Sequence, residues 1–573
     1  MIQSLAQPEF PRQFVEPDAR FESWPAIEPY FAELAKRPVA SLADFERWLF
    51  DWSELEAAFA EENTRRYTAM TCRTDDDATR DRFLDYVENV KPLREPWAHK
   101  LNQRFVALAD KFPLPEKRYE VLERSIRAEI ELFREENIPL ETIDEKLATD
   151  YQQITGVMSV TFRDQEHTIQ QMSLYLEDND RMTREAAWRA TAQRYLDDAP
   201  KLDALYAEMV NVRGQIAANA DVANFRDYRF RAMERFDYTP GDCLAFHNAI
   251  ERVVLPAARE INARRRKALD VASLRPWDLD VDPAGRPALR PFATVAELED
   301  GCERIFADVD ADFAKIFATM RGQNMLDLDS RKGKAPGGYQ ATFDERRMPY
   351  IFMNAVGTDD DVRTLLHEGG HAFHTWACRQ DPLLPYRNYP TEFAEVASMG
   401  MECLAAGLME DYYGHETPRA QRQFFEKIVL FFPYMACVDA FQHFVYTNAE
   451  AGLDAWKDHW ESLMQRFSTG VDQAGLEEFR RHSWHRKLHI FELPFYYVEY
   501  GIAQIGALQV WLNAKRDYRE AVAFYRQGLS LGGSRPLPEL FEAAGCKFDF
   551  TEATLKPLID AVMEEIDGLK YSR

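Results

Sequence analysis

Five consecutive residues, His367-Glu-Gly-Gly-His371, have the types and spacing that metal-dependent hydrolysis requires. Residues four apart on a helix lie one above the other, so His367 and His371 can direct both imidazoles at one metal ion. Glu368 then lies at the rim of that site, beside the position of a metal-activated water. The alternative is a pair of buried structural histidines. The pattern predicts a metal site with a carboxylate base.

A catalytic zinc site takes three protein ligands, and the next predicted helix, 390–402, offers the third. Glu395 and Glu402 are seven residues apart, share one helix face and stand among apolar residues. A carboxylate in such surroundings needs a partner, which metal coordination supplies. We expect Glu395 to bind one Zn²⁺ per chain and Glu402 to accept a hydrogen bond from a ligand histidine. Glu392 is expected to be exposed to solvent.

The helix that carries the histidines has a clear start and an unusual interior. Thr358 is the expected N-cap, and the acidic residues 359–361 place negative charge at the positive end of the helix. Gly369 and Gly370 lie in mid-helix, where each costs about 1 kcal/mol relative to alanine. A glycine pair is explained if another backbone, such as a strand at 349–356, packs very closely.

A strand is predicted directly before this helix, at 348–357, from its aromatic and β-branched residues between Pro and Gly. An exposed strand edge beside a metal site binds an extended peptide through main-chain hydrogen bonds. The basic, glycine-containing segment 329–339 is either an ordinary surface loop or a mobile lid. The candidate substrate-binding residues on these segments are Gly337, Gly338, Tyr339, Tyr350, Phe352 and Asn354.

The rest of the chain has to frame this site. Between about residues 27 and 135, apolar residues recur at spacings of three and four, which predicts successive amphipathic helices. A small β-hairpin is predicted from 157–162 and 167–172. We predict a mainly α protein with a small sheet beside the metal helix. We divide it into an N-terminal helical lobe, 1–195, and a catalytic domain, 196–573.

Composition excludes several classes of protein. With 46% hydrophobic and 13% aromatic residues, the 573-residue chain is typical of folded globular proteins. The net charge of −26 disfavours nucleic acid and anionic membranes as partners, and solubility explains it more simply than substrate steering. An odd number of cysteines, seven, without a C-x-x-C pair predicts a reducing compartment, and residues 1–20 lack an apolar signal core. We expect a cytoplasmic protein, and the sequence does not determine its oligomeric state.

Together, His367-Glu-Gly-Gly-His371, Glu395-Val-Ala-Ser398 and Glu402 resemble the M3 family of zinc metallopeptidases, most closely its oligoendopeptidase F and Pz-peptidase branch. The family's phenylalanine after the catalytic glutamate is Gly369 here, outside the metal ligands. The resemblance covers residues 200–565 well and the preceding part only in its helical character.

A distal segment, 489–500, resembles the family's histidine and tyrosine segment. The resemblance implies that His489, Tyr497 and Tyr500 hydrogen-bond the substrate carbonyl and its oxyanion, as phenol and imidazole donors are suited to do. Tyr496 is the adjacent alternative to Tyr497. Taken alone, the segment also fits a buried aromatic helix.

The resemblance implies a two-lobed, zincin-like endopeptidase with a deep central cleft that hydrolyses short oligopeptides. Zn²⁺ is then held by His367, His371 and Glu395, and Glu368 acts first as general base and then as general acid. One alternative is a dipeptidyl carboxypeptidase of the same fold. Another is a non-catalytic peptide-binding protein on that fold, against which the intact Glu368 argues.

Overall fold

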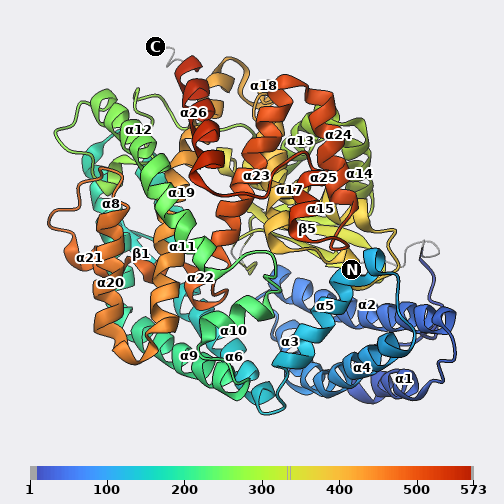
Figure 1. Cartoon of the computed structure of the whole chain (residues 1–573). Coiled ribbons are helices and arrows are strands. Elements are labelled where there is room, and N and C mark those ends of the chain that lie inside the picture. Colours follow the sequence, from blue (N-terminus) through green and yellow to red (C-terminus); the bar gives the residue numbers. More distant parts are fainter. Residues whose placement is uncertain (1–9, 332, 336, 570–573) are drawn as a thin grey trace. The chain divides into compact units, whose positions relative to one another are not determined.

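The computed structural model describes residues 10–331, 333–335 and 337–569, and helices make up most of it (Figure 1). The chain folds into two compact units, each assembled from three separate segments. The first unit contains Met1–Ile138, Arg290–Gly414 and Gly506–Phe548, and the second contains Pro139–Leu289, His415–Ile505 and Asp549–Arg573. The division predicted after residue 195 does not coincide with this one, because residue 195 lies inside a segment of the second unit.

Helices of the first unit bury the apolar faces that the sequence predicts. In the N-terminal group, Phe45, Trp48 and Phe105 are fully buried and belong to one core cluster. The helices are α1 (Trp24–Lys36), α2 (Leu42–Cys72), α3 (Asp77–Asn89), α4 (Lys91–Lys111), α5 (Glu116–Leu132), α13 (Val295–Val309), α14 (Ala311–Gly322), α15 (Asp359–Cys378), α16 (Leu384–Arg387), α17 (Thr391–Ala405), α18 (Glu410–Tyr413), α24 (Tyr518–Ser530) and α25 (Leu537–Ala543).

A three-stranded sheet lies beside α15 in this unit, as predicted. Its strands are, in spatial order, β3 (Leu326–Asp329), β5 (Met348–Ala355) and β4 (Tyr339–Phe343). Strand β5 runs parallel to β3, with Ile351 opposite Leu326, and antiparallel to β4, with Phe352 opposite Tyr339. Both sides of β5 are therefore paired.

The prediction that 349–356 forms an exposed strand edge is wrong. Strand β5 is the central strand, and β4 is the edge strand on the antiparallel side. Seven of the eight β5 residues are buried, so the run of apolar and aromatic residues reflects a central strand. The pattern of one strand does not reveal its neighbours.

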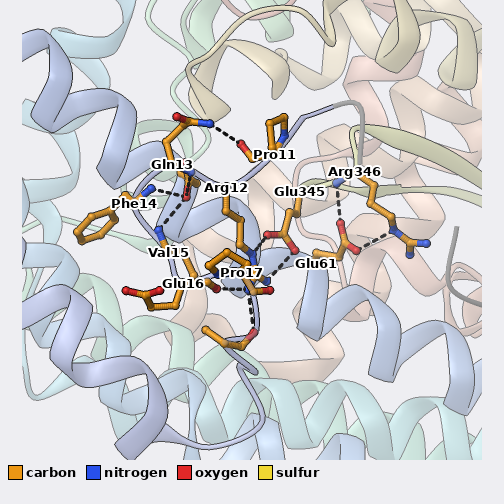
Figure 2. Close-up of polar contacts among 12 residues, drawn as sticks. Pro11, Arg12, Gln13, Phe14, Val15, Glu16, Pro17, Glu61, Glu345 and Arg346 are labelled. Carbon is orange, nitrogen blue, oxygen red and sulfur yellow. Dashed lines mark hydrogen bonds and ion pairs between the residues drawn. The ribbon is translucent and has the colours of Figure 1, made fainter. Parts of the chain in front are cut away.

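The turn between β4 and β5 is fastened to the N-terminal part of the same unit (Figure 2). Arg12 Nη2 donates a hydrogen bond to Oε2 of Glu345 in the turn at 3.0 Å. The backbone N–H of Arg346 donates to Glu61 Oε2, and its Nε donates to Glu61 Oε1, both at 2.8 Å. These ion pairs hold one end of the β4–β5 hairpin.

In the second unit, the predicted hairpin is present as β1 (Ser159–Phe162) and β2 (Gln165–Thr168). The prediction that its second strand runs to residue 172 is wrong, because Thr168 caps a helix that begins at Ile169. Its helical elements are α6 (Asn137–Gly156), which begins at the unit boundary, α7 (Ile169–Ser173), η1 (Leu174–Glu177), α8 (Arg181–Asp197), α9 (Ala199–Asn219), α10 (Phe225–Ala232), α11 (Pro240–Ala249), η2 (Ile250–Val254), α12 (Leu255–Ala268), η3 (Pro276–Asp278), η4 (Gly414–Glu416), α19 (Thr417–Thr447), η5 (Ala449–Ala451), α20 (Gly452–Arg466), α21 (Glu477–Arg481), η6 (Ser483–Arg486), α22 (Leu488–Phe491), α23 (Tyr497–Arg516), which continues into the first unit, and α26 (Glu552–Gly568).

Among the described residues, one helical stretch, Glu410–Thr447, is long and apolar enough to cross a membrane by length and composition. Within its most apolar window, 78% is buried inside the protein. The core helix of a folded protein has this character.

Candidate metal centre

Helix α15 begins at the predicted cap. The Thr358 side chain accepts from the N–H of Asp361, and the Asp361 side chain accepts in return from the N–H of Thr358. The same carboxylate also accepts from the N–H groups of Val356 and Gly357, at 2.9 Å each. This arrangement fixes the direction in which the chain passes from β5 into the metal helix.

The two mid-helix glycines face other helices, not β5. A Cβ atom on Gly370 would lie 2.4 Å from the carbonyl oxygen of Ala397 and 2.6 Å from Cα of Ser398, both on α17. A Cβ atom on Gly369 would lie 2.6 Å from the ring of Phe306 on α13. The expectation that strand 349–356 is the closely packed backbone is therefore wrong. Gly370 instead lets α17 approach α15, which brings Glu395 to the histidines.

The predicted ligands meet at one point. Glu395 Oε2 lies 3.3 Å from Nε2 of His367 and 3.6 Å from Nε2 of His371, and the three side chains offer ligand atoms within 4.8 Å of one another. Two imidazole nitrogens and one carboxylate oxygen are a donor set that Zn²⁺ takes in catalytic sites. Ser398 Oγ donates to Glu395 Oε2 at 2.9 Å and thereby orients the carboxylate. The residues present fit the ion.

Two further carboxylates of α17 differ in their surroundings. Glu402 Oε1 lies 2.8 Å from Nδ1 of His367, the contact predicted for it. Glu392, by contrast, is only 4% exposed, so its predicted exposure is wrong. The reason is that α17 packs against α13, α15, α24 and α25, which cover more than one of its faces.

Burial and charge shift the pKa values of the three groups on α15. Burial raises the pKa of Glu368 to about 7. Burial lowers the pKa of His371 to about 4. In His367, burial works toward a lower pKa, but the hydrogen bonds that the imidazole donates to Glu395 and Glu402 outweigh it and raise the pKa well above its usual value. A carboxylate that titrates near neutrality is suited to both accepting and donating a proton.

Edge strand β4 lies along the metal helix. Thr342 Oγ1 lies 3.1 Å from Thr375 Oγ1, and Gln340 Nε2 donates to the same hydroxyl at 3.4 Å. The backbone of Gln340 also hydrogen-bonds Glu368. Sequence reasoning missed Gln340, because a main-chain contact to a residue 28 positions away has no side-chain signature.

Three predicted substrate-binding residues have partners inside the first unit. Phe352 is fully buried and stacks on Tyr339, with ring centroids 4.8 Å apart. The Tyr339 hydroxyl lies 2.6 Å from Thr71 Oγ1, and the Tyr350 hydroxyl lies 3.2 Å from Cys72 Sγ. Through these contacts the aromatic residues hold the sheet against α2, which is a structural role.

Asn354, Gly337 and Gly338 lie where the loop 330–338 meets the sheet. The Asn354 amide donates to the carbonyl oxygen of Gly337 at 2.9 Å, and both glycines are exposed. Lys334 of the same loop is buried, and its Nζ donates to the carbonyl oxygens of Asp329 and Met353 at 2.8 and 2.6 Å. The described part of the loop is thus anchored to the ends of β3 and β5.

The distal segment forms an aromatic cluster in the second unit. The ring of His489, on α22, lies 5.0 Å from Tyr497, 5.7 Å from Tyr500 and 5.8 Å from Tyr496, measured between centroids. Tyr497 is 6% exposed, whereas Tyr496 and Tyr500 are partly exposed. The sequence therefore identified residues that lie together, and their roles toward a substrate stay predictions.

Fold and site together define a mainly α-helical protein with an H-E-x-x-H metal centre. The sequence profile of peptidase family M3 matches residues 174–558. The chain belongs to this family, as the motifs predicted.

Curated relatives agree with this assignment. An oligoendopeptidase F homolog of Borreliella burgdorferi is 23% identical over 399 residues, which are 64% of this chain and 62% of the relative. Oligopeptidase PepF of Bacillus subtilis is 24% identical over 304 residues, 51% of this chain and 43% of the relative. Each match thus spans less than two thirds of the relative's length.

Solved structures share the fold over nearly the whole chain. A structure of Pz peptidase A with an inhibitor has a TM-score of 0.89 at 24% identity and covers 98% of this chain and 99% of that one. Oligoendopeptidase F from Enterococcus faecium has a TM-score of 0.62 at 12% identity, covering 95% and 96%.

Proposed function

We propose that the protein is a zinc-dependent endopeptidase that hydrolyses short oligopeptides. The observation that carries this proposal is the convergence of His367, His371 and Glu395, with the buried Glu368 beside them. Relatives named as oligoendopeptidases and an oligopeptidase support the substrate class. A cytoplasmic location and one catalytic zinc per chain belong to the same proposal.

Zn²⁺ held by His367, His371 and Glu395 would supply Lewis-acid polarisation of a water and of the scissile carbonyl. Glu368 takes the proton of that water as general base and returns it to the leaving amine as general acid. Burial raises the pKa of Glu368, which favours the return of the proton to the leaving amine as well as its uptake. Glu402 holds the His367 imidazole in the orientation that leaves Nε2 for the metal.

Stabilisation of the oxyanion is assigned to His489, Tyr497 and Tyr500, following the family resemblance. Hydrogen-bond donors aimed at a developing oxyanion contribute about 3–4 kcal/mol each to the transition state. The clustering of the three rings supports a common role for them.

Peptide binding is assigned to β4 in place of β5. Strand β4 is an edge strand and contacts Glu368 through the backbone of Gln340, so a peptide paired with its outer side would pass the base. Gly337, Gly338 and Tyr339 lead into this strand. Tyr350 and Phe352 pair with it from β5, and Asn354 holds the loop before it through the carbonyl oxygen of Gly337.

The test of this function is Glu368→Gln in the full-length protein. It removes the base and keeps the size of the side chain. We expect zinc content to equal that of the wild type and turnover of internally quenched peptides to fall by 10²-fold or more. The matched control is Glu410→Gln, which changes an exposed glutamate of the same unit. Wild-type turnover by a zinc-loaded Glu368→Gln protein contradicts the assignment.

A peptide length series separates the endopeptidase from a dipeptidyl carboxypeptidase. An endopeptidase cleaves peptides with free and amidated carboxyl termini alike, whereas an enzyme restricted to chain ends requires the free carboxylate. Stoichiometric zinc without turnover across diverse peptides would identify a peptide-binding protein instead.

A further inference from the structure

A second group of metal-ligand side chains lies in the second unit, where none was predicted. Cys243 and His247 are four residues apart on α11, and Asp439 and His443 are four residues apart on α19. The two helices pack against each other (Figure 1). Because residues four apart share a helix face, each helix presents a pair of ligand-type side chains to the other. All four residues are buried, with exposed fractions of 0 to 4%.

The four side chains gather around the Asp439 carboxylate. Its Oδ2 lies 2.8 Å from Nε2 of His247 and 3.2 Å from Nε2 of His443. Cys243, Asp439 and His443 offer ligand atoms within 4.8 Å of one another, the same closeness found for His367, His371 and Glu395. The geometry admits a single small cation in contact with all three.

Several polar atoms in this group make no hydrogen bond to any residue that the structure describes. They are Asp439 Oδ1, His247 Nδ1 and His443 Nδ1, while His443 Nε2 has only its 3.2 Å ion-pair contact with Asp439. Buried polar groups are nearly always paired, and leaving one unpaired costs about 1–3 kcal/mol. A carboxylate is especially costly to bury without a countercharge. A cation beside Asp439 and His443 would satisfy the carboxylate and one imidazole lone pair together.

The surroundings are aromatic and locally irregular. Rings of Phe230 and Phe495 pack edge-on against His443, with centroids 5.8 and 5.3 Å away. Directly after His247 and the end of α11, the chain forms a π-helical turn, η2. Such turns are rare and are frequently found at functional sites.

We propose that Cys243, Asp439 and His443 bind a second divalent transition-metal ion, and that His247 orients the Asp439 carboxylate through its hydrogen bond. Thiolate, imidazole and carboxylate together suit Zn²⁺ and similar ions, and not Mg²⁺ or Ca²⁺, which prefer oxygen ligands. The Cys243 thiol releases its proton to solvent when the ion binds, so thiolate and carboxylate balance the two positive charges.

The ion has a structural role, because all four residues of the group are buried and none of them is assigned to catalysis. It joins α11 to α19, helices that are nearly 200 residues apart in sequence. Gln442, next to His443, accepts the backbone N–H of Phe495 at 2.8 Å. Phe495 has a positive φ of 67°, so this contact holds a conformation that non-glycine residues rarely adopt. The metal thus supports the turn that leads into Tyr497.

Metal counting tests the proposal on the full-length protein. We expect two zinc ions per chain in the wild type, one in His367→Ala/His371→Ala, and none when Cys243→Ser and His443→Ala are added. Zinc X-ray absorption of His367→Ala/His371→Ala should show a sulfur ligand at about 2.3 Å. One zinc per wild-type chain, all bound without sulfur, overturns the proposal.

Cobalt substitution gives a readout independent of activity and of the first centre. A sulfur-to-cobalt charge-transfer band requires a cysteine ligand, which the centre of His367, His371 and Glu395 lacks. We expect the band in the wild type and in His367→Ala/His371→Ala, and its loss in Cys243→Ser. The matched control is Cys437→Ser, which changes another buried thiol of α19 and should keep the band.

If Cys243→Ser does not fold, the proposal is still tested by metal counting and by the cobalt spectrum of the proteins that keep Cys243. A cobalt-saturated wild type without the band overturns the proposal, as does a band that survives in folded Cys243→Ser. Added zinc should also raise the Tm of metal-free His367→Ala/His371→Ala, and an unchanged Tm counts against the site.

Discussion

Nδ1 of His367 lies 2.8 Å from Oε1 of Glu402, while Nε2 of the same ring lies 3.3 Å from Glu395. With Glu402 accepting a hydrogen bond from Nδ1–H, the lone pair of Nε2 is directed at the metal position. One helix, α17, therefore supplies both a ligand and the group that sets the tautomer of another ligand.

Removal of this contact should weaken metal binding without removing a ligand. We expect Glu402→Ala to raise the zinc Kd by about 10–100-fold, because the imidazole loses its fixed orientation and some basicity. Chelator competition at constant pH measures the change. Glu410→Ala, an exposed glutamate of the same unit, serves as control, and an unchanged Kd in Glu402→Ala would show that the contact has no such role.

Activity should depend on pH through Glu368. Burial raises the pKa of its carboxyl group, and only the deprotonated form acts as base, so kcat/KM should rise with pH along an acidic limb set by Glu368. A profile measured from pH 5 to 9 at saturating zinc tests this. The absence of an acidic limb in this range would contradict it.

The same pKa shift predicts the sign of a stability effect in the metal-free protein. Between pH 4.5 and about 7, folded Glu368 keeps a proton that the unfolded chain has lost. Its stabilising contribution is complete below pH 4.5 and is lost as the pH rises through 7. Glu368→Gln should flatten this decline in the free energy of unfolding, measured by denaturant titration at several pH values.

Gly370→Ala should separate the two ligand-bearing helices. The new Cβ would meet the backbone of Ala397 and Ser398, which cannot move without shifting α17, so we expect a loss of about 1–3 kcal/mol in stability together with weaker zinc binding. Thermal unfolding and zinc titration measure both.

The control for this substitution is Gly214→Ala in the middle of α9, where nothing lies within 4 Å of the new Cβ. It should stabilise the protein by up to about 1 kcal/mol, since alanine is the better helix former. Equal changes in stability from Gly370→Ala and Gly214→Ala would show that α15 and α17 are not packed as closely as the structure indicates.

Loss of single hydroxyl groups should identify the oxyanion donors. Tyr497→Phe and Tyr500→Phe are each expected to lower kcat by about 10²–10³-fold while zinc content stays constant. Tyr496→Phe tests the adjacent alternative. If Tyr496→Phe alone lowers kcat, the assignment moves from Tyr497 to Tyr496.

Much of the centre follows from the sequence because its rules are local. Helix periodicity places His367 and His371 on one face, and the same rule places Glu395 and Glu402 together on the next helix. The cap at Thr358 and the hairpin at 159–168 depend on side chains and turns a few residues apart. Such interactions are encoded in short windows of sequence, so they can be predicted without the tertiary structure.

Only the tertiary structure decided which distant segments meet. Strand β5 became a central strand because β3 and β4 pair with it, and Gly370 faces α17 because that helix packs on α15. Cys243 and Asp439 meet although 196 positions separate them. Strand pairing and helix packing bring together residues that are far apart in the sequence. The apolar pattern of one element shows that the element is buried, but it does not show which other element packs against it.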